Sequence, residues 1–112
     1  MATPGHTPGS LSLLLECEGR RWALACDAVK NRLELLTGRA AMTRDPEKSR
    51  RSIEVIGAWA DAIVSGHDAL LAVVREAGGL RVREKVPSVV ELTVAVDGET
   101  EKFYSLSPAG LW

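Results

Sequence analysis

Three side chains that can bind a metal stand where an expected strand, or the approach to one, meets a loop. They are His6, Asp27 and His67. Imidazole nitrogen and carboxylate oxygen are the ligands of catalytic zinc, manganese and iron. These two histidines are the only ones in the chain, and each directly follows a glycine. These three residues are therefore the candidate metal ligands of the chain, and no catalytic residue independent of them is expected.

Plainer interpretations remain open for each of these residues. A lone histidine is more often a surface or hydrogen-bonded side chain, and an aspartate after a strand more often forms a turn or a cap. Asp68 either contacts a metal ligand or caps a following helix. Ser10 lies near His6 but lacks the pattern of a nucleophile elbow, which disfavours a serine hydrolase. Two cysteines, Cys17 and Cys26, are expected to be small apolar fillers without a disulfide.

The elements that would position these residues begin with a β-hairpin over residues 11–28. A turn centred on Gly19-Arg20 would pair Leu15 with Leu24. The same register pairs Leu13 with Cys26 and Cys17 with Trp22. Alternation then places one apolar set on a single face, which we expect to be the core surface: Leu11, Leu13, Leu15, Cys17, Trp22, Leu24 and Cys26.

The middle of the chain predicts alternating helices and strands. A short helix ends near Leu36 and is closed by Gly38. A longer helix begins at Asp45, its N-cap, with apolar residues at helical spacing. Residues 60–68, "ADAIVSGHD", indicate a buried strand that ends in a loop, and residues 69–79, "ALLAVVREAGG", a short helix with a glycine stop.

The end of the chain predicts a second hairpin, over 88–106. Two strand-like segments, 88–96 and 100–106, flank Asp97-Gly98, a strong signal for a two-residue turn. Together these elements indicate one α/β layered domain over residues 1–112, with a mixed sheet, β-hairpins and two to three helices.

Composition narrows the possible partners and the compartment. The chain has 112 residues, of which 46% are hydrophobic and 26% charged, and its net charge is −1. This balance favours a folded protein and gives no electrostatic case for binding nucleic acid or an anionic membrane. No apolar run is long enough to span a bilayer, and the N-terminus lacks the pattern of a signal peptide. We therefore expect a cytoplasmic protein.

Three segments in order resemble the metallo-β-lactamase-fold hydrolases. They are "TPGHTPGSLSLLL" from residue 3, "ALACDAV" from residue 23 and "ADAIVSGHD" from residue 60, so the core of the match covers residues 3–68. The resemblance implies that His6 binds one metal, that Asp27 bridges two, and that His67 binds the second. The rigid Pro-Gly pairs around His6 would then aim its ring at the metal.

The resemblance also implies a fold and an activity. The chain would be the C-terminal half of an αββα sandwich, and the "HxHxDH" motif of the family would lie upstream of it. In the complete fold, zinc, one ion or two, would activate a hydroxide for attack on an ester, lactone, thioester or amide carbonyl of a small molecule. Manganese and iron accept the same ligands.

Because the upstream ligands are missing from this chain, we expect it to be inactive alone. The alternative is a non-catalytic remnant or a binding module that keeps the fold. The apolar hairpin face needs a cover, which predicts a homodimer or a complex with the missing N-terminal half.

Overall fold

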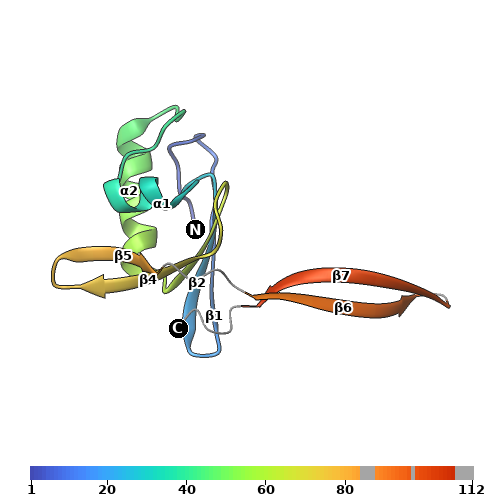
Figure 1. Cartoon of the computed structure of the whole chain (residues 1–112). Coiled ribbons are helices and arrows are strands. Elements are labelled where there is room, and N and C mark those ends of the chain that lie inside the picture. The colour runs from blue at the N-terminus through green and yellow to red at the C-terminus, as the bar shows by residue number, and fades with distance from the viewer. Residues whose placement is uncertain (84–87, 97, 108–112) are drawn as a thin grey trace.

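The structure is a computed structural model that describes residues 1–83, 88–96 and 98–107. Over these residues it is an α/β fold with a five-stranded mixed sheet, two helices and a separate two-stranded sheet (Figure 1). The elements are β1 (Leu13–Cys17), β2 (Arg20–Cys26), α1 (Arg32–Thr37), α2 (Pro46–Trp59), β3 (Ala62–Ser65), β4 (Leu71–Glu76), β5 (Gly79–Arg83), β6 (Ser88–Val96) and β7 (Glu99–Ser107).

The sheet has the strand order β1-β2-β3-β4-β5. Strands β2 and β3 are parallel, and the other neighbouring pairs are antiparallel. A parallel pair needs a crossover connection, which α1 and α2 provide here. As a result, β2 and β3 end at the same edge of the sheet, and the loops that follow them lie near each other.

Both helices begin, and α1 also ends, as local sequence rules require. Asn31 caps α1 by accepting from the backbone nitrogen of Glu34, and Gly38 closes it in the left-handed conformation, with φ 67°. Asp45 caps α2 by accepting from the backbone nitrogen of Lys48, and Pro46 follows at the first helical position. The predicted closing of α1 at Gly38 and the predicted N-cap of α2 at Asp45 are confirmed.

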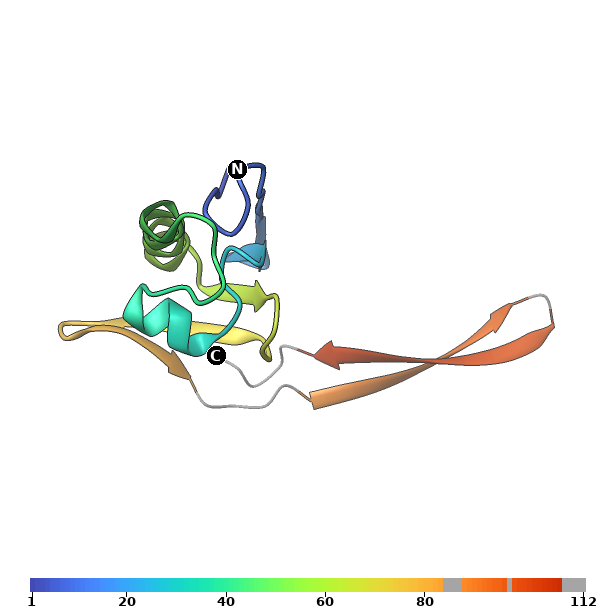
Figure 2. The ribbon, with the colours of Figure 1, turned by 90° about the horizontal axis from the view of Figure 1, so that it is seen from above.

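A hydrophobic core lies between the helices and one face of the sheet. Alternate residues of β2, β3, β4 and β5 enter it, together with one side of α2 and Leu35 of α1. Its largest fully buried side chains are Ile53, Ile56, Ile63, Leu71 and Val29. Both helices pack on this face, and no helix of the described residues lies on the opposite face of the sheet (Figure 2).

An arginine–aspartate network attaches the end of α2 to the sheet. Asp61 accepts from the backbone and the guanidinium of Arg21, and its Oδ1 lies 3.2 Å from Nη1 of Arg75. Arg75 also donates to the Gly57 carbonyl oxygen in the last turn of the helix. The hydrogen bonds from Arg21 lower the pKa of Asp61 to about 2.

The predicted register of the first hairpin is wrong by two residues. Leu13 pairs with Leu24 and Leu15 with Trp22, because the turn residues are Glu18 and Gly19. Both have positive φ, 53° and 71°, which is the turn geometry that matches the twist of a hairpin. Moving the centre of the turn by one residue shifts the pairing by two, so the division of side chains between the two faces is retained.

The predicted core face of this hairpin is also wrong. The helices cover the other face, where Ala23 and Ala25 are fully buried, whereas Leu13 is 60% exposed. Cys17 and Cys26 are exposed free thiols rather than core fillers. The small alanine side chains let α2 approach β2 closely, which explains why the face with fewer large residues became the core.

The helix predicted over residues 69–79 is wrong as well. Residues 71–76 form strand β4, and Gly79 begins β5 after a tight turn. Gly79 has φ 119°, which favours glycine, so the glycine pair marks a hairpin turn and not a helix stop. Buried Leu71 and Val73 alternate along the strand and enter the core between β3 and β5.

The C-terminal hairpin is confirmed. Strands β6 and β7 pair from Ser88↔Ser107 to Val96↔Glu99, on either side of the predicted turn. The two views agree that this hairpin projects away from the five-stranded sheet, on the side opposite the helices (Figures 1 and 2). Within the described residues, no helix is long and apolar enough to cross a membrane.

Candidate metal centre

The structure brings His6, Asp27 and His67 together, although they come from three separate segments. The Asp27 carboxylate lies between the two imidazoles. Its Oδ1 is 3.0 Å from Nε2 of His67, and its Oδ2 is 3.4 Å from Nε2 of His6. Each carboxylate oxygen therefore faces a different histidine.

The loop that carries His6 is held against the start of α2. The Gly5 carbonyl oxygen accepts hydrogen bonds from the backbone nitrogens of Arg44 and Asp45, at 3.1 and 3.0 Å. Gly5 has φ 142°, and a Cβ at this position would lie 2.2 Å from Oγ of Ser49. Only glycine permits this approach, so the glycine before His6 sets the distance between the loop and the helix.

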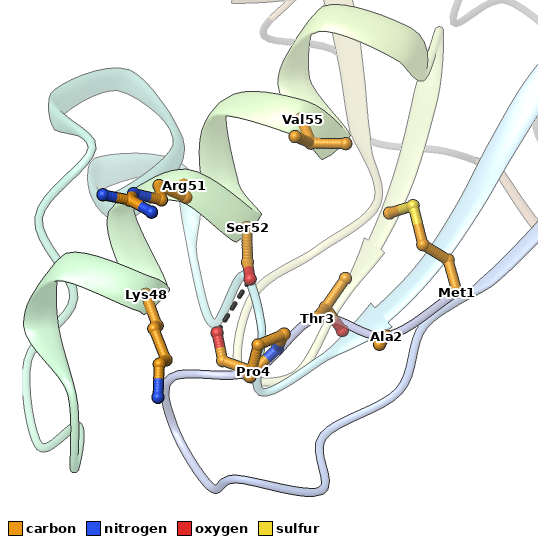
Figure 3. A pocket seen from close by; sticks show the side chains of 8 residues that line it. All are labelled: Met1, Ala2, Thr3, Pro4, Lys48, Arg51, Ser52 and Val55. Atoms are coloured by element: carbon orange, nitrogen blue, oxygen red, sulfur yellow. Dashed lines mark hydrogen bonds between the residues drawn. The ribbon is translucent and has the colours of Figure 1, made fainter.

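A second contact holds the same segment two residues before His6. Ser52 of α2 donates from Oγ to the Pro4 carbonyl oxygen at 2.8 Å (Figure 3). Beside this bond lies a cavity of about 440 Å³ between the N-terminal segment and α2. None of the three predicted ligands lines it, so we assign the cavity no part in the metal site.

Asp27 follows an irregular end of β2. The pairing of β2 with β3 shifts register between Leu24 and Cys26, and Cys26 has φ 48°. A side-chain-bearing residue in the left-handed region is strained, and such strain concentrates at functional sites. The irregular backbone directs the Asp27 side chain across Gly66, where a Cβ would lie 2.5 Å from Oδ1 of Asp27.

His67 is positioned through its backbone. Its amide nitrogen donates to the Lys30 carbonyl oxygen at 2.7 Å, and that of Gly66 donates to the Val29 carbonyl oxygen at 3.2 Å. These bonds join the loop after β3 to the segment that follows Asp27. The His67 side chain is otherwise open, with 63% of its surface exposed.

Asp68 does not cap a following helix, because the next element is strand β4. Its carboxylate accepts from the backbone nitrogen and from Nε of Arg32, at 3.0 and 3.1 Å, and from the backbone nitrogen of Ala69. The Arg32 guanidinium lowers the pKa of Asp68 to about 2. Asp68 therefore fastens the His67 loop to the start of α1.

A buried ion pair between Lys30 and Glu34 supports the segment that contacts the His67 loop. The Glu34 carboxylate, with a side chain only 4% exposed, lies 3.1 Å from Nζ of Lys30. It also accepts from the backbone nitrogens of Lys30 and Ala41, at 3.1 and 2.9 Å. Since the Lys30 carbonyl oxygen receives the His67 amide, Glu34 fixes the residue against which His67 is aligned.

Sequence reasoning did not identify these supporting residues. An asparagine followed three residues later by a glutamate, as at Asn31 and Glu34, resembles a capping box and could have indicated the role of Glu34. The pair Arg32–Asp68 spans 36 residues and has no local signal. The need for glycine at position 66 arises only when Asp27 packs against it.

The imidazole nitrogens and carboxylate oxygens of the three predicted ligands meet only some of the requirements of a metal site. Two ligand atoms on one tetrahedral zinc, bonded at about 2.0–2.1 Å, are roughly 3.3 Å apart, close to the 3.4 Å between Asp27 and His6. Asp27 and His67, at 3.0 Å, are joined by a direct hydrogen bond. The geometry corresponds to two partial sites that share Asp27, each with one imidazole. Among the residues described, no three His, Cys, Asp or Glu side chains are placed to hold a single ion.

One further feature of His6 bears on metal binding. Its Nδ1 is buried and has no hydrogen-bond partner within the described part of the chain. A histidine that binds metal through Nε2 usually donates from Nδ1 to a carboxylate or carbonyl, which fixes its ring. His6 lacks that support, and the loop contacts at Gly5 and Pro4 orient it instead.

No family model matches the sequence, and no curated protein matches it significantly. The assignment of chemistry to this centre therefore depends on the residues and their geometry.

Proposed function

We propose that this chain is the metal-binding C-terminal half of a metallo-β-lactamase-type hydrolase, with His6, Asp27 and His67 as its metal ligands. The observation that carries the proposal is the Asp27 carboxylate, whose two oxygens face two imidazoles from opposite ends of the 3–68 segment. A carboxylate in this position can bridge two ions. The resemblance of the three sequence segments assigns the same roles to the same residues.

Each residue has one part in the proposed centre. His6 and one Asp27 oxygen would hold one ion, and His67 and the other oxygen a second. A zinc ion held in this way supplies Lewis-acid activation of water for attack on an ester, lactone, thioester or amide carbonyl. Catalytic zinc sites have three protein ligands, so each partial site has one too few. We infer weak binding of zinc and no appreciable turnover by the chain alone.

The direct test is calorimetric titration of the purified chain with zinc. We expect weak binding that His6→Ala and His67→Ala each reduce and Asp27→Asn abolishes. Asp45→Asn is the matched control, because it removes the same charge from another loop while asparagine remains a good N-cap. Unchanged binding in both histidine variants would exclude the assignment.

A second candidate function is a non-catalytic module that retains the fold, and the two-ligand partial sites favour it. Assays with lactone, thioester and β-lactam substrates in the presence of zinc separate the two. Zinc-dependent turnover that Asp27→Ala removes would show a complete active site in the chain and contradict our inference of inactivity. Zinc binding without turnover agrees with both candidates, and adding an N-terminal half that carries the missing motif then distinguishes them.

A further inference from the structure

The cavity between the N-terminal segment and α2 has the size of a small-molecule site. On one side it is lined by four residues of α2 at spacings of three and four, which share one face of the helix: Lys48, Arg51, Ser52 and Val55. Residues 1–4 line the other side. We call it the N-terminal cavity. Its volume of about 440 Å³ lies within the range of about 300–1,000 Å³ that is typical of ligand sites.

The charged side chains of the N-terminal cavity have one sign. Among the described residues that line it, those with a charged side chain are Lys48 and Arg51, and both are positive. Both side chains are well exposed, so a ligand can reach them. Because a concave surface with charges of one sign attracts ligands of the opposite sign, the cavity favours an anion.

Both cations have an acidic partner but keep donors for a ligand. Nζ of Lys48 lies 3.3 Å from Oδ2 of Asp45. Nε of Arg51 lies 3.3 Å from Oε1 of Glu47. Exposed ion pairs between residues three or four apart stabilise a protein little, so a ligand can share these cations at small cost. An ammonium has three donors and a guanidinium five, which leaves hydrogen bonds for a further carboxylate.

The rest of the wall offers mainly apolar contact. Met1 and Val55 line it and are 46% and 51% exposed. The two hydroxyl groups in the wall are used within the protein. Oγ1 of Thr3 is hydrogen-bonded to Oγ of Ser12, and Oγ of Ser52 donates to a backbone carbonyl oxygen. A ligand that covers Met1 and Val55 is stabilised by removing their apolar surface from water.

The charged and the apolar parts of the wall lie at different ends. In Figure 3, Lys48 and Arg51 lie at the left of the cavity, and Met1 and Val55 at its right. Lys48 and Val55 are seven residues apart, which is about 10 Å along the helix axis. A ligand that contacts both ends therefore needs an anionic head and an apolar chain of about this length.

We propose that the N-terminal cavity binds a small aliphatic carboxylate. Its head contacts Lys48 and Arg51, and its chain lies against Met1 and Val55. One negative charge suits the two cations. A phosphate carries up to two charges, and the nearby carboxylates of the α2 cap and first turn would repel it more strongly.

This site is independent of the candidate metal centre. None of the three predicted metal ligands lines the N-terminal cavity. Measurements in EDTA also prevent a carboxylate from binding to zinc instead of to the protein. The result therefore tests the cavity whether or not the proposed zinc site is correct.

The experiment is titration of the full chain with octanoate in EDTA, followed by calorimetry and by the backbone amide NMR signals. We expect saturable binding, with shifted signals from residues 1–4 and from α2. Octylamine has the same chain with the opposite charge, and acetate has the head without the chain. Each should bind about tenfold more weakly than octanoate, because each lacks one of the two contacts.

Substitutions in α2 test the two ends of the cavity separately. Lys48→Gln and Arg51→Gln each remove one exposed cation while keeping a good helix former, and each should weaken octanoate binding about threefold to tenfold. Val55→Thr keeps the shape of an exposed side chain but makes it polar, and should weaken binding about threefold. Arg50→Gln is the matched control, because it removes the same charge beside Arg51 but outside the cavity wall. It should leave binding unchanged.

Several results would overturn the proposal. Octanoate that does not saturate, or that shifts signals away from the N-terminal segment and α2, excludes this site. Equal binding of octylamine and octanoate excludes the role of the cations. If Arg50→Gln weakens binding as much as Arg51→Gln, the effect comes from net charge and not from the cavity.

Discussion

Replacing Gly66 with alanine is expected to displace the Asp27 carboxylate from His67. The new Cβ would lie 2.5 Å from Oδ1 of Asp27 and 2.9 Å from the Cys26 carbonyl oxygen. Gly66 does not have positive φ, so alanine fits its backbone conformation. The cost of Gly66→Ala is therefore steric overlap alone.

The magnitude follows from these distances. An ordinary contact of a Cβ is 3.4–4 Å, so the carboxylate must move by about 1 Å or the loops must separate. Overpacking of this kind costs about 1–3 kcal/mol of folding free energy. Metal sites tolerate deviations of only about 0.2 Å. If Asp27 binds zinc, its displacement should weaken zinc binding at least tenfold.

The assay combines urea unfolding with zinc titration. Gly9→Ala is the control, because Gly9 also lacks positive φ and a Cβ there would have no neighbour within 4 Å. It lies in the His6 loop and should leave both measurements within error. If Gly66→Ala is as stable as Gly9→Ala and binds zinc equally well, Asp27 does not pack against Gly66 as described.

Two further predictions concern stability. The pKa of Asp61 is lowered to about 2 from an ordinary 3.8, so its ion pairs stabilise the fold above about pH 4 and lose that contribution as pH falls towards 2. Partial exposure limits this contribution to about 1–2 kcal/mol of folding free energy. In urea unfolding, Asp61→Asn should therefore lose less stability between pH 4 and pH 2 than the parent chain loses. Cys26→Gly should raise the free energy of unfolding by up to about 1 kcal/mol, because Cys26 has φ 48° and glycine adopts this conformation without strain. A melting temperature below that of the parent chain would contradict this prediction.

Local signals predicted the helices and the C-terminal hairpin, but they could not distinguish β4 from a helix. The caps at Asn31 and Asp45 act within a few residues, so they are visible in the sequence. The segment from Leu71 to Glu76 is too short for its periodicity to decide between the two structures. Its position between β3 and β5, which only the assembled sheet reveals, determines the outcome.

The sequence indicated which residues meet at the candidate centre, but not how they are held. His6, Asp27 and His67 stood at the predicted strand ends, and the structure places them together. The contacts that position them join distant segments, such as Arg32 with Asp68. The choice of the core face could not be predicted either, because the larger side chains of the first hairpin lie on the face without helices.

The parallel pairing of β2 with β3 has a consequence for the order of folding. The hairpins β1–β2 and β4–β5 close through tight turns, whereas Asp27 and His67 are 40 residues apart in the chain. Closing so long a loop costs entropy before the parallel pair returns any stabilising contact. The two hairpins should therefore form first, and the two partial sites should meet only when the crossover has docked. A metal that needs both of them cannot nucleate folding, and would act on this chain by slowing its unfolding.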